Sequence, residues 1–94
     1  MLFLIISTPA VQRPSDVLLQ RRKFWPWAQT QLDKGLAREF YARTGRGGVA
    51  IFDVDSNDTL HRLLNEWADI MPATFEIYPL LDTTQIKAFL GNNE

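Results

Sequence analysis

The sequence predicts an α+β domain with the order β-α-β-β-α-β, a four-stranded antiparallel sheet and a short C-terminal helix. Four segments have the length and apolar pattern of strands, and two longer segments have helical features. Gly or Pro residues occur in the connections between them. Because such folds stack two layers around one core, both long helices should cover the same face of the sheet. The 94 residues suffice for a single domain, 1–94, with a thin core.

The first half of the chain predicts a strand, a long helix and a second strand. Residues 2–7 are apolar on both alternating faces, which is typical of a central strand buried on two sides. Ser15 is a candidate cap for a helix that runs to about Lys34, and Pro26 should kink or split that helix. Residues 36–44 then alternate between two faces. The more polar of these faces carries Glu39, Tyr41 and Arg43.

The second half predicts a hairpin, a second helix and an edge strand. A Gly-rich turn joins the second strand to a third at residues 49–54, so the two form a hairpin. Apolar residues then recur at helical spacing from Leu60 to Ala68, the clearest periodic signal in the chain. Pro79 removes a ladder donor from the strand at residues 74–81, which places that strand at an edge. A short helix from Thr83 to Leu90 follows.

With both helices on one face, the other face of the sheet has no cover of its own. It should carry one apolar face from each of the two inner strands, between polar residues of the outer strands. Those polar residues are Glu39, Tyr41, Arg43, Glu76 and Tyr78. An exposed apolar band of that size is uncommon on a monomer. We therefore expect a homodimer in which two sheets pack face to face.

The composition excludes several classes of protein. The chain has no cysteine, which excludes disulfides, zinc thiolate sites and cysteine nucleophiles. A single histidine and scattered acids give no metal-ligand spacing, and we expect neither a metal nor another cofactor. No segment approaches the roughly 20 apolar residues that span a bilayer. Residues 1–6 lack the basic flank of a signal peptide and predict a strand, so the expected compartment is the cytoplasm.

The charge is distributed unevenly along the chain. Residues 1–46 hold eight basic and three acidic side chains, whereas residues 47–94 hold two basic and eight acidic ones. Chance and solvated faces are one explanation, and complementary patches that help copies associate are the other. Nucleic-acid binding is disfavoured, because no basic-aromatic recognition motif accompanies the basic half.

The segment Phe52–Leu64, with the sequence FDVDSNDTLHRLL, resembles the muconolactone isomerase family at the third strand and second helix. Met1–Phe3 and Tyr78–Leu80 are similar to that family as well. The resemblance implies a dimeric α/β barrel of ferredoxin-like subunits, often assembled further into rings. It also implies an activity that moves a double bond in a small lactone during the catabolism of aromatic compounds.

The chain departs from the family pattern at three places near the expected pocket. Leu4 and Ile6 stand where the family has a His and an Arg in the first strand. Arg46–Gly48 replaces a Tyr-Ala-Asn segment, and residues 65–72 replace a Leu-Phe-Pro stretch. Function is determined by the site rather than by the fold. The resemblance therefore predicts the fold more strongly than it predicts a lactone substrate.

Three residues are candidates for moving a proton: Glu39, Asp53 and His61. His61 is the only histidine, the side-chain type that suits proton transfer near neutral pH, although it also suits a helix boundary. Asp53 ends an apolar strand, where a carboxylate serves either as a pocket base or as a turn stabiliser. Glu39 shares a strand face with Tyr41 and Arg43, and these polar groups need partners if they are buried. Either a substrate or a second subunit supplies those partners.

The candidate substrate-binding residues are aromatic or basic. An arginine binds a carboxylate through two parallel hydrogen bonds, and tryptophans build a flat apolar wall. Trp25 and Trp27 flank Pro26, where a broken helix would form the lip of a pocket. Core packing is the alternative for all three tryptophans, most of all for Trp67. The full set is Trp25, Trp27, Tyr41, Arg43, Arg46 and Trp67.

Three functions remain open at this point. The first is an isomerase-like enzyme that performs cofactor-free proton transfer on a lactone or aromatic-derived acid, held by Arg43 or Arg46. The second is a cofactor-free monooxygenase or cyclase of the same barrel type. The third is a binding or assembly module without catalysis. The expected partners are a small-molecule substrate and a second copy in a homodimer or larger ring, with no nucleic acid and no membrane.

Overall fold

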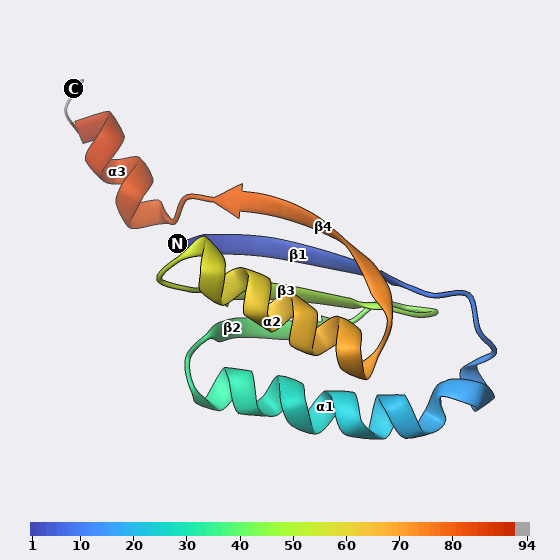
Figure 1. The fold of residues 1–94 in the computed structure, drawn as a ribbon. Coiled ribbons are helices and arrows are strands. Elements are labelled where there is room, and N and C mark those ends of the chain that lie inside the picture. The colour runs from blue at the N-terminus through green and yellow to red at the C-terminus, as the bar shows by residue number, and fades with distance from the viewer. Residues whose placement is uncertain (92–94) are drawn as a thin grey trace.

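A computed structural model describes residues 1–91, and positions 92–94 of the predicted domain lie outside the described residues. The elements are β1 (Leu2–Pro9), a 3₁₀ turn η1 (Pro14–Val17), α1 (Leu18–Asp33), β2 (Ala37–Ala42), β3 (Gly48–Asp53), α2 (Asn57–Ile70), β4 (Ala73–Leu80) and α3 (Thr83–Gly91). Figure 1 shows α1 and α2 on one side of the sheet, and α3 beyond its end. The predicted α+β class and its element order are confirmed.

The four strands form one antiparallel sheet in the order β2-β3-β1-β4. This is the ferredoxin-like arrangement, in which β1 lies between β3 and β4. Ile5 of β1 is opposite Ala50 on one side and Ile77 on the other. The central place of β1 explains why its sequence is apolar on both alternating faces. β4 is an edge strand, as Pro79 predicts.

The core lies between the sheet and the two long helices, and Trp67 of α2 is at its centre. The Trp67 side chain is 2% exposed. Its ring centroid lies 5.0 Å from that of Phe24, 5.1 Å from Phe40 and 5.2 Å from Phe75. These three neighbours come from α1, β2 and β4, so a single indole joins both layers. The other buried residues of α2 are Leu60, Leu63 and Leu64, which confirms the helical period.

The ends of α2 follow from its sequence. The Ser56 hydroxyl accepts a hydrogen bond from the Thr59 backbone N–H at 3.2 Å, which caps the first turn. The helix ends at Ile70, two residues before Pro72. Asp82 and Gln85 form a second cap at the start of α3, each accepting from the other's backbone N–H. Among residues 1–91, no helix combines the length and the apolar character needed to cross a membrane.

For the first helix, one alternative predicted at Pro26 and the predicted cap are wrong. Pro26 does not split the helix, because α1 continues from Leu18 to Asp33 with Pro26 inside, and a kink at Pro26 stays a prediction. The carbonyl that loses its helical partner belongs to Arg22, an exposed residue. Ser15 lies inside the 3₁₀ turn that precedes α1 and provides no side-chain cap.

A β-bulge interrupts the alternation of β2. Ala37 is opposite Phe52 and Glu39 is opposite Ile51, so Arg38 is the extra residue. Its guanidinium pairs with the Asp53 carboxylate, with 2.8 Å between Nη2 and Oδ2. Strict alternation would have directed Arg38 towards the core. The bulge instead lets it meet a carboxylate at the end of β3.

The face of the sheet opposite the helices is uncovered by α1 and α2, as predicted. Half-buried aliphatic side chains of the two inner strands form its centre: Leu4, Ile6, Val49 and Ile51. Each edge strand adds a Glu-x-Tyr motif. The Tyr41 hydroxyl donates to Glu39 at 2.8 Å, and the Tyr78 hydroxyl donates to Glu76 at 2.8 Å. We call this surface the open face.

Candidate functional site

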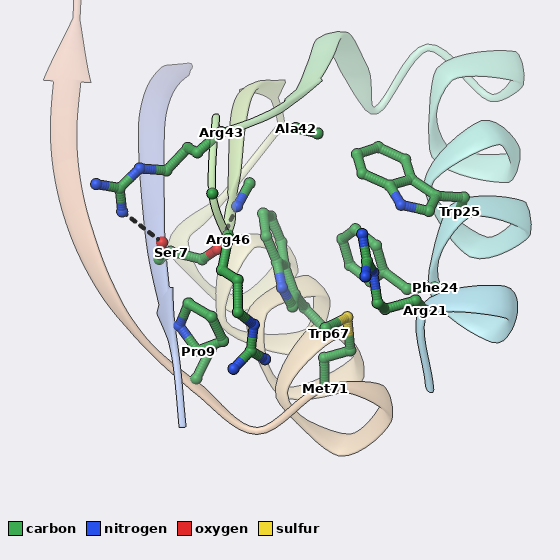
Figure 2. A pocket seen from close by; sticks show the side chains of 14 residues that line it. Ser7, Pro9, Arg21, Phe24, Trp25, Ala42, Arg43, Arg46, Trp67 and Met71 are labelled. Carbon is green, nitrogen blue, oxygen red and sulfur yellow. Dashed lines mark hydrogen bonds between the residues drawn. The ribbon is translucent and has the colours of Figure 1, made fainter. Parts of the chain in front are cut away.

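A cavity of about 60 Å³ lies on the helix side of the sheet, where α1 and α2 meet the turn between β2 and β3. Figure 2 shows aromatic side chains from both helices on one side and β1 with the β2–β3 turn on the other. The lining residues that matter most to its chemistry are Ser7, Arg21, Trp25, Arg43, Arg46 and Trp67. The cavity is therefore assembled from segments that are far apart in the sequence.

The aromatic side of the cavity consists of Phe24 and Trp25 from α1 with Trp67 and Met71 from α2. Phe24 and Trp25 meet edge to face, with ring centroids 5.1 Å apart. Trp67 comes this close to β3 because Gly48 has no side chain. A Cβ at Gly48 would lie 3.0 Å from Cζ2 of the indole. Gly48 thus makes room for the floor of the cavity.

The opposite side is built on Ser7, a polar residue that is 2% exposed. Its hydroxyl accepts a hydrogen bond from the Gly48 N–H at 2.7 Å, and its carbonyl accepts one from Arg43 Nη1 at 2.9 Å. Gly47 packs here with a φ of 107°, and a Cβ on it would lie 2.6 Å from the Ser7 carbonyl oxygen. These contacts hold the β2–β3 turn against β1. A serine hydroxyl also carries one hydrogen that it can donate to a ligand.

Three arginines line the cavity, and no carboxylate does so among the described residues. Arg21 comes from the first turn of α1, and Arg43 and Arg46 from the β2–β3 turn. Arg46 Nη1 donates to the carbonyls of Ala10 at 3.2 Å and Gln12 at 2.8 Å. Arginine remains protonated in proteins, so the cavity has a positive potential that favours anions.

Four of the nine predicted site residues line this cavity: Trp25, Arg43, Arg46 and Trp67. Trp27 does not line it, and its indole Nε1 donates to Glu66 at 3.0 Å. Tyr41 lies on the open face, bonded to Glu39. Four predicted residues therefore share one cavity lining, and their role in binding stays a prediction.

The three candidates for proton transfer lie at separate places outside the cavity lining. Glu39 is on the open face. Asp53 is at the far end of β3 from the turn, paired with Arg38 and with the N-terminal ammonium of Met1. His61 is exposed on α2, with its Nε2 3.1 Å from the Asn65 side-chain nitrogen. A catalytic role for any of them remains a prediction.

The ionisable groups with shifted pKa values also lie away from the cavity. The hydrogen bond to the Glu39 carboxylate, together with its charge, raises the pKa of Tyr41. Glu76 raises the pKa of Tyr78 in the same way. A hydrogen bond from Thr59 lowers the pKa of Asp55 at the start of α2. The edge tyrosines therefore stay protonated donors over a wide pH range.

Two polar lining residues escape prediction from sequence, Ser7 and Arg21. One of them leaves a signal that can be recognised afterwards. Ser7 is the first polar residue after the apolar run that opens its strand, and the Gly-Gly pair marks a close approach of two backbones. Arg21 has no such signal, because it belongs to a run of basic residues that is typical of a solvated helix face.

Fold and cavity together define a small ferredoxin-like α+β protein with an arginine-lined aromatic pocket. The family profile described as Domain of unknown function (DUF3303) matches residues 1–93, and the chain belongs to that family. No curated protein matches the chain.

Proposed function

We propose that this protein binds a small organic acid in the cavity between α1, α2 and the β2–β3 turn. The observation that supports this function is the lining of the cavity, in which an aromatic wall faces three arginines and, within residues 1–91, no carboxylate. An anion loses its hydration on entering such a site, and charge-assisted hydrogen bonds to arginine compensate for that loss. A flat apolar group on the same ligand packs against the indole rings.

The ligand class that fits is a carboxylated lactone or an aromatic-derived acid. Trp25 and Trp67 suit its ring, Arg21 and Arg46 suit its carboxylate, and the Ser7 hydroxyl offers one neutral donor. This is the class of compound that the resemblance to muconolactone isomerase implies. The proposal places the protein in the breakdown of aromatic compounds as an isomerase-like protein without a cofactor.

Proton transfer requires a base, and none of the described residues that line the cavity supplies one. Arginine is not deprotonated in proteins, and a serine hydroxyl needs a neighbouring base to accept a proton. An isomerase would therefore take its base from Glu39, Asp53 or His61, brought to the ligand by another copy or by a rearrangement. Binding without catalysis needs no such step, which makes it the second candidate function.

We also propose that the protein forms a homodimer through the open face. The aliphatic centre of that face resembles a protein interior, while the Tyr-Glu pairs at both edges suit a polar rim. Two copies packed in this way would form the dimeric barrel that the resemblance implies.

The experiment is a calorimetric titration with acetate, benzoate and benzamide. Benzamide is the matched control, since it keeps the ring and replaces the charge. We expect benzoate to bind most tightly, acetate weakly and benzamide at least tenfold more weakly than benzoate. Equal affinity for benzoate and benzamide, or no heat from any carboxylate, would contradict an anion site. Conversion of muconolactone by the wild type, lost on replacing Glu39, Asp53 or His61, would then separate the enzyme from the binding module.

A further inference from the structure

The cavity is too small for the ligand class proposed above. Its volume is about 60 Å³, whereas pockets for small organic ligands enclose roughly 300–1,000 Å³. A second space of about 330 Å³ lies beside it, beneath residues 8–12. Pro9, Arg43 and Arg46 line both spaces. A partition of three side chains therefore separates a small aromatic cavity from a larger groove.

The two arginines of the partition differ in what holds them: Arg46 is hydrogen-bonded to a loop, whereas Arg43 is hydrogen-bonded to a strand. Arg43 donates to the Ser7 carbonyl on the central strand, which is a rigid acceptor. Arg46 donates to Ala10 and Gln12, on either side of Val11, which is fully exposed. Figure 2 shows the Arg46 side chain extending from the turn past Pro9.

The segment over the groove is fixed at both ends and held in the middle by Arg46. The Ala10 N–H donates to the Pro72 carbonyl at 2.9 Å, which secures the end next to β1. Arg13 pairs with Asp16 in the 3₁₀ turn, with 3.1 Å between Nε and Oδ2, which secures the other end. Between these points, two solvent-exposed hydrogen bonds from the Arg46 side chain hold the backbone of residues 10–12.

We propose that the groove beneath residues 8–12 is a second subsite of the same pocket, and that Arg46 is the gate between the two. The carboxylate of a ligand accepts hydrogen bonds from the Arg46 guanidinium, which then no longer donates to the carbonyls of Ala10 and Gln12. A carboxylate wins this competition because it is an anionic acceptor that can take two parallel hydrogen bonds from the guanidinium, whereas each backbone carbonyl is a neutral acceptor. The released segment then moves, and the joined space exceeds the ~300 Å³ lower bound for small-ligand pockets.

This inference rests on the proposed function, because the ligand that opens the gate is the small organic acid. It adds a role to Arg46 that binding alone does not require. If Arg46 acted only through its charge, it would attract the acid and leave residues 10–12 in place. If Arg46 is the gate, binding of the acid also releases residues 10–12.

The test measures amide hydrogen exchange at Ala10 by NMR, with benzoate as the probe, in the wild type, Arg46→Ala and Arg22→Ala. Loss of two exposed hydrogen bonds should raise the Ala10 exchange rate about tenfold in Arg46→Ala without ligand. Saturating benzoate should raise it by a similar factor in the wild type and leave Arg46→Ala unchanged. Arg22→Ala removes an exposed arginine of α1 that lines neither space, so this control should respond to benzoate like the wild type.

A second variant separates the effect of the positive charge of Arg46 from the effect of its hydrogen bonds to the two loop carbonyls. Arg46→Lys keeps the positive charge but replaces the planar guanidinium, whose Nη1 donates to both carbonyls, by a compact ammonium on a different stem. It should therefore exchange like Arg46→Ala while losing less benzoate affinity. Unchanged exchange in Arg46→Ala, or benzoate binding that slows exchange at Ala10, would overturn the gate. Failure of the wild type to bind any acid overturns the proposed function instead, and the ligand-free comparison of Arg46→Ala with wild type still decides whether Arg46 holds the loop.

Discussion

The two faces of the sheet are made by the same strands and have opposite surroundings. On the covered face, Phe3, Ile5 and Phe52 are at most 6% exposed and pack under the helices. On the open face, the neighbouring residues of the same strands are aliphatic but only half-buried. Strand alternation alone distributes residues between the faces, and the helices alone decide which face becomes a core.

The comparison teaches that an apolar strand residue has two distinct uses in a small domain. Buried under α1 and α2, it contributes to the stability of the fold. Exposed on the open face, it contributes little to the monomer and is available to a second copy. Substitutions on one strand can separate these uses, because adjacent residues point to opposite faces.

The largest effect is expected from a lysine on the covered face of β3. Ala50 is completely buried, so Ala50→Lys buries an unpaired ammonium and overfills the core, at a cost of about 5 kcal/mol or more. A small domain has a total stability of about 5–15 kcal/mol, so we expect the chain to lose its cooperative unfolding transition. Circular dichroism with urea denaturation measures this.

The next residue along β3 provides the matched control. Ile51→Lys lies on the open face and should preserve the fold of the monomer while raising the dimer dissociation constant by at least about 100-fold, measured by sedimentation. Unfolding of both variants would show that the open face belongs to the core. A fully dimeric Ile51→Lys protein would place the contact between copies elsewhere.

Removal of the Trp67 indole should reduce the free energy of unfolding slightly less than Ala50→Lys does. Trp67→Ala leaves a large hole between both layers, and such truncations cost about 3–5 kcal/mol. Trp25→Ala, on the rim of the same cavity and 38% exposed, should cost less than half as much. Denaturant midpoints of the two variants give the comparison. Similar losses of stability would mean that Trp25 and Trp67 contribute equally to the free energy of unfolding.

The β2–β3 turn offers a third and smaller effect. Gly47→Ala introduces a side chain at a φ of 107° and against the Ser7 carbonyl, with an expected loss of about 1–3 kcal/mol. Gly45→Ala has a φ of 94° but open space around it, so it measures the backbone strain alone. The difference between their unfolding free energies reports the close contact with β1. No difference would mean that the turn can move away from Ser7.

The smallest effect concerns the edge tyrosines of the open face. Their raised pKa values mean that the folded chain holds these protons more strongly than the unfolded chain does. The resulting stabilisation is present below the usual tyrosine pKa of about 10 and is lost as the pH rises through the folded value. Glu39→Gln should lower the pKa of Tyr41 and leave Tyr78 unchanged, as followed by phenolate absorbance. A Tyr41 titration unaffected by this change would exclude the pairing.

The local chemistry of the chain made much of the fold predictable. The period of α2, its serine cap and the proline after it specify that helix without help from the rest of the molecule. The Gly-rich turn specifies the hairpin between β2 and β3 in the same way. The site was less predictable, because Ser7, Arg21 and Met71 meet only when β1, α1 and α2 are packed together. Their positions in the sequence show no shared pattern.

The sequence by itself determined the order of the elements, the two faces of each strand and the aromatic and basic character of the pocket. These depend on the periodicity of side chains and on backbone preferences, which act over a few residues. Only the tertiary structure decided that α1 would pass through Pro26, that a bulge would send Arg38 to Asp53, and which arginines would face the cavity. Those outcomes depend on contacts between distant segments, whose free energy is absent until the layers have packed.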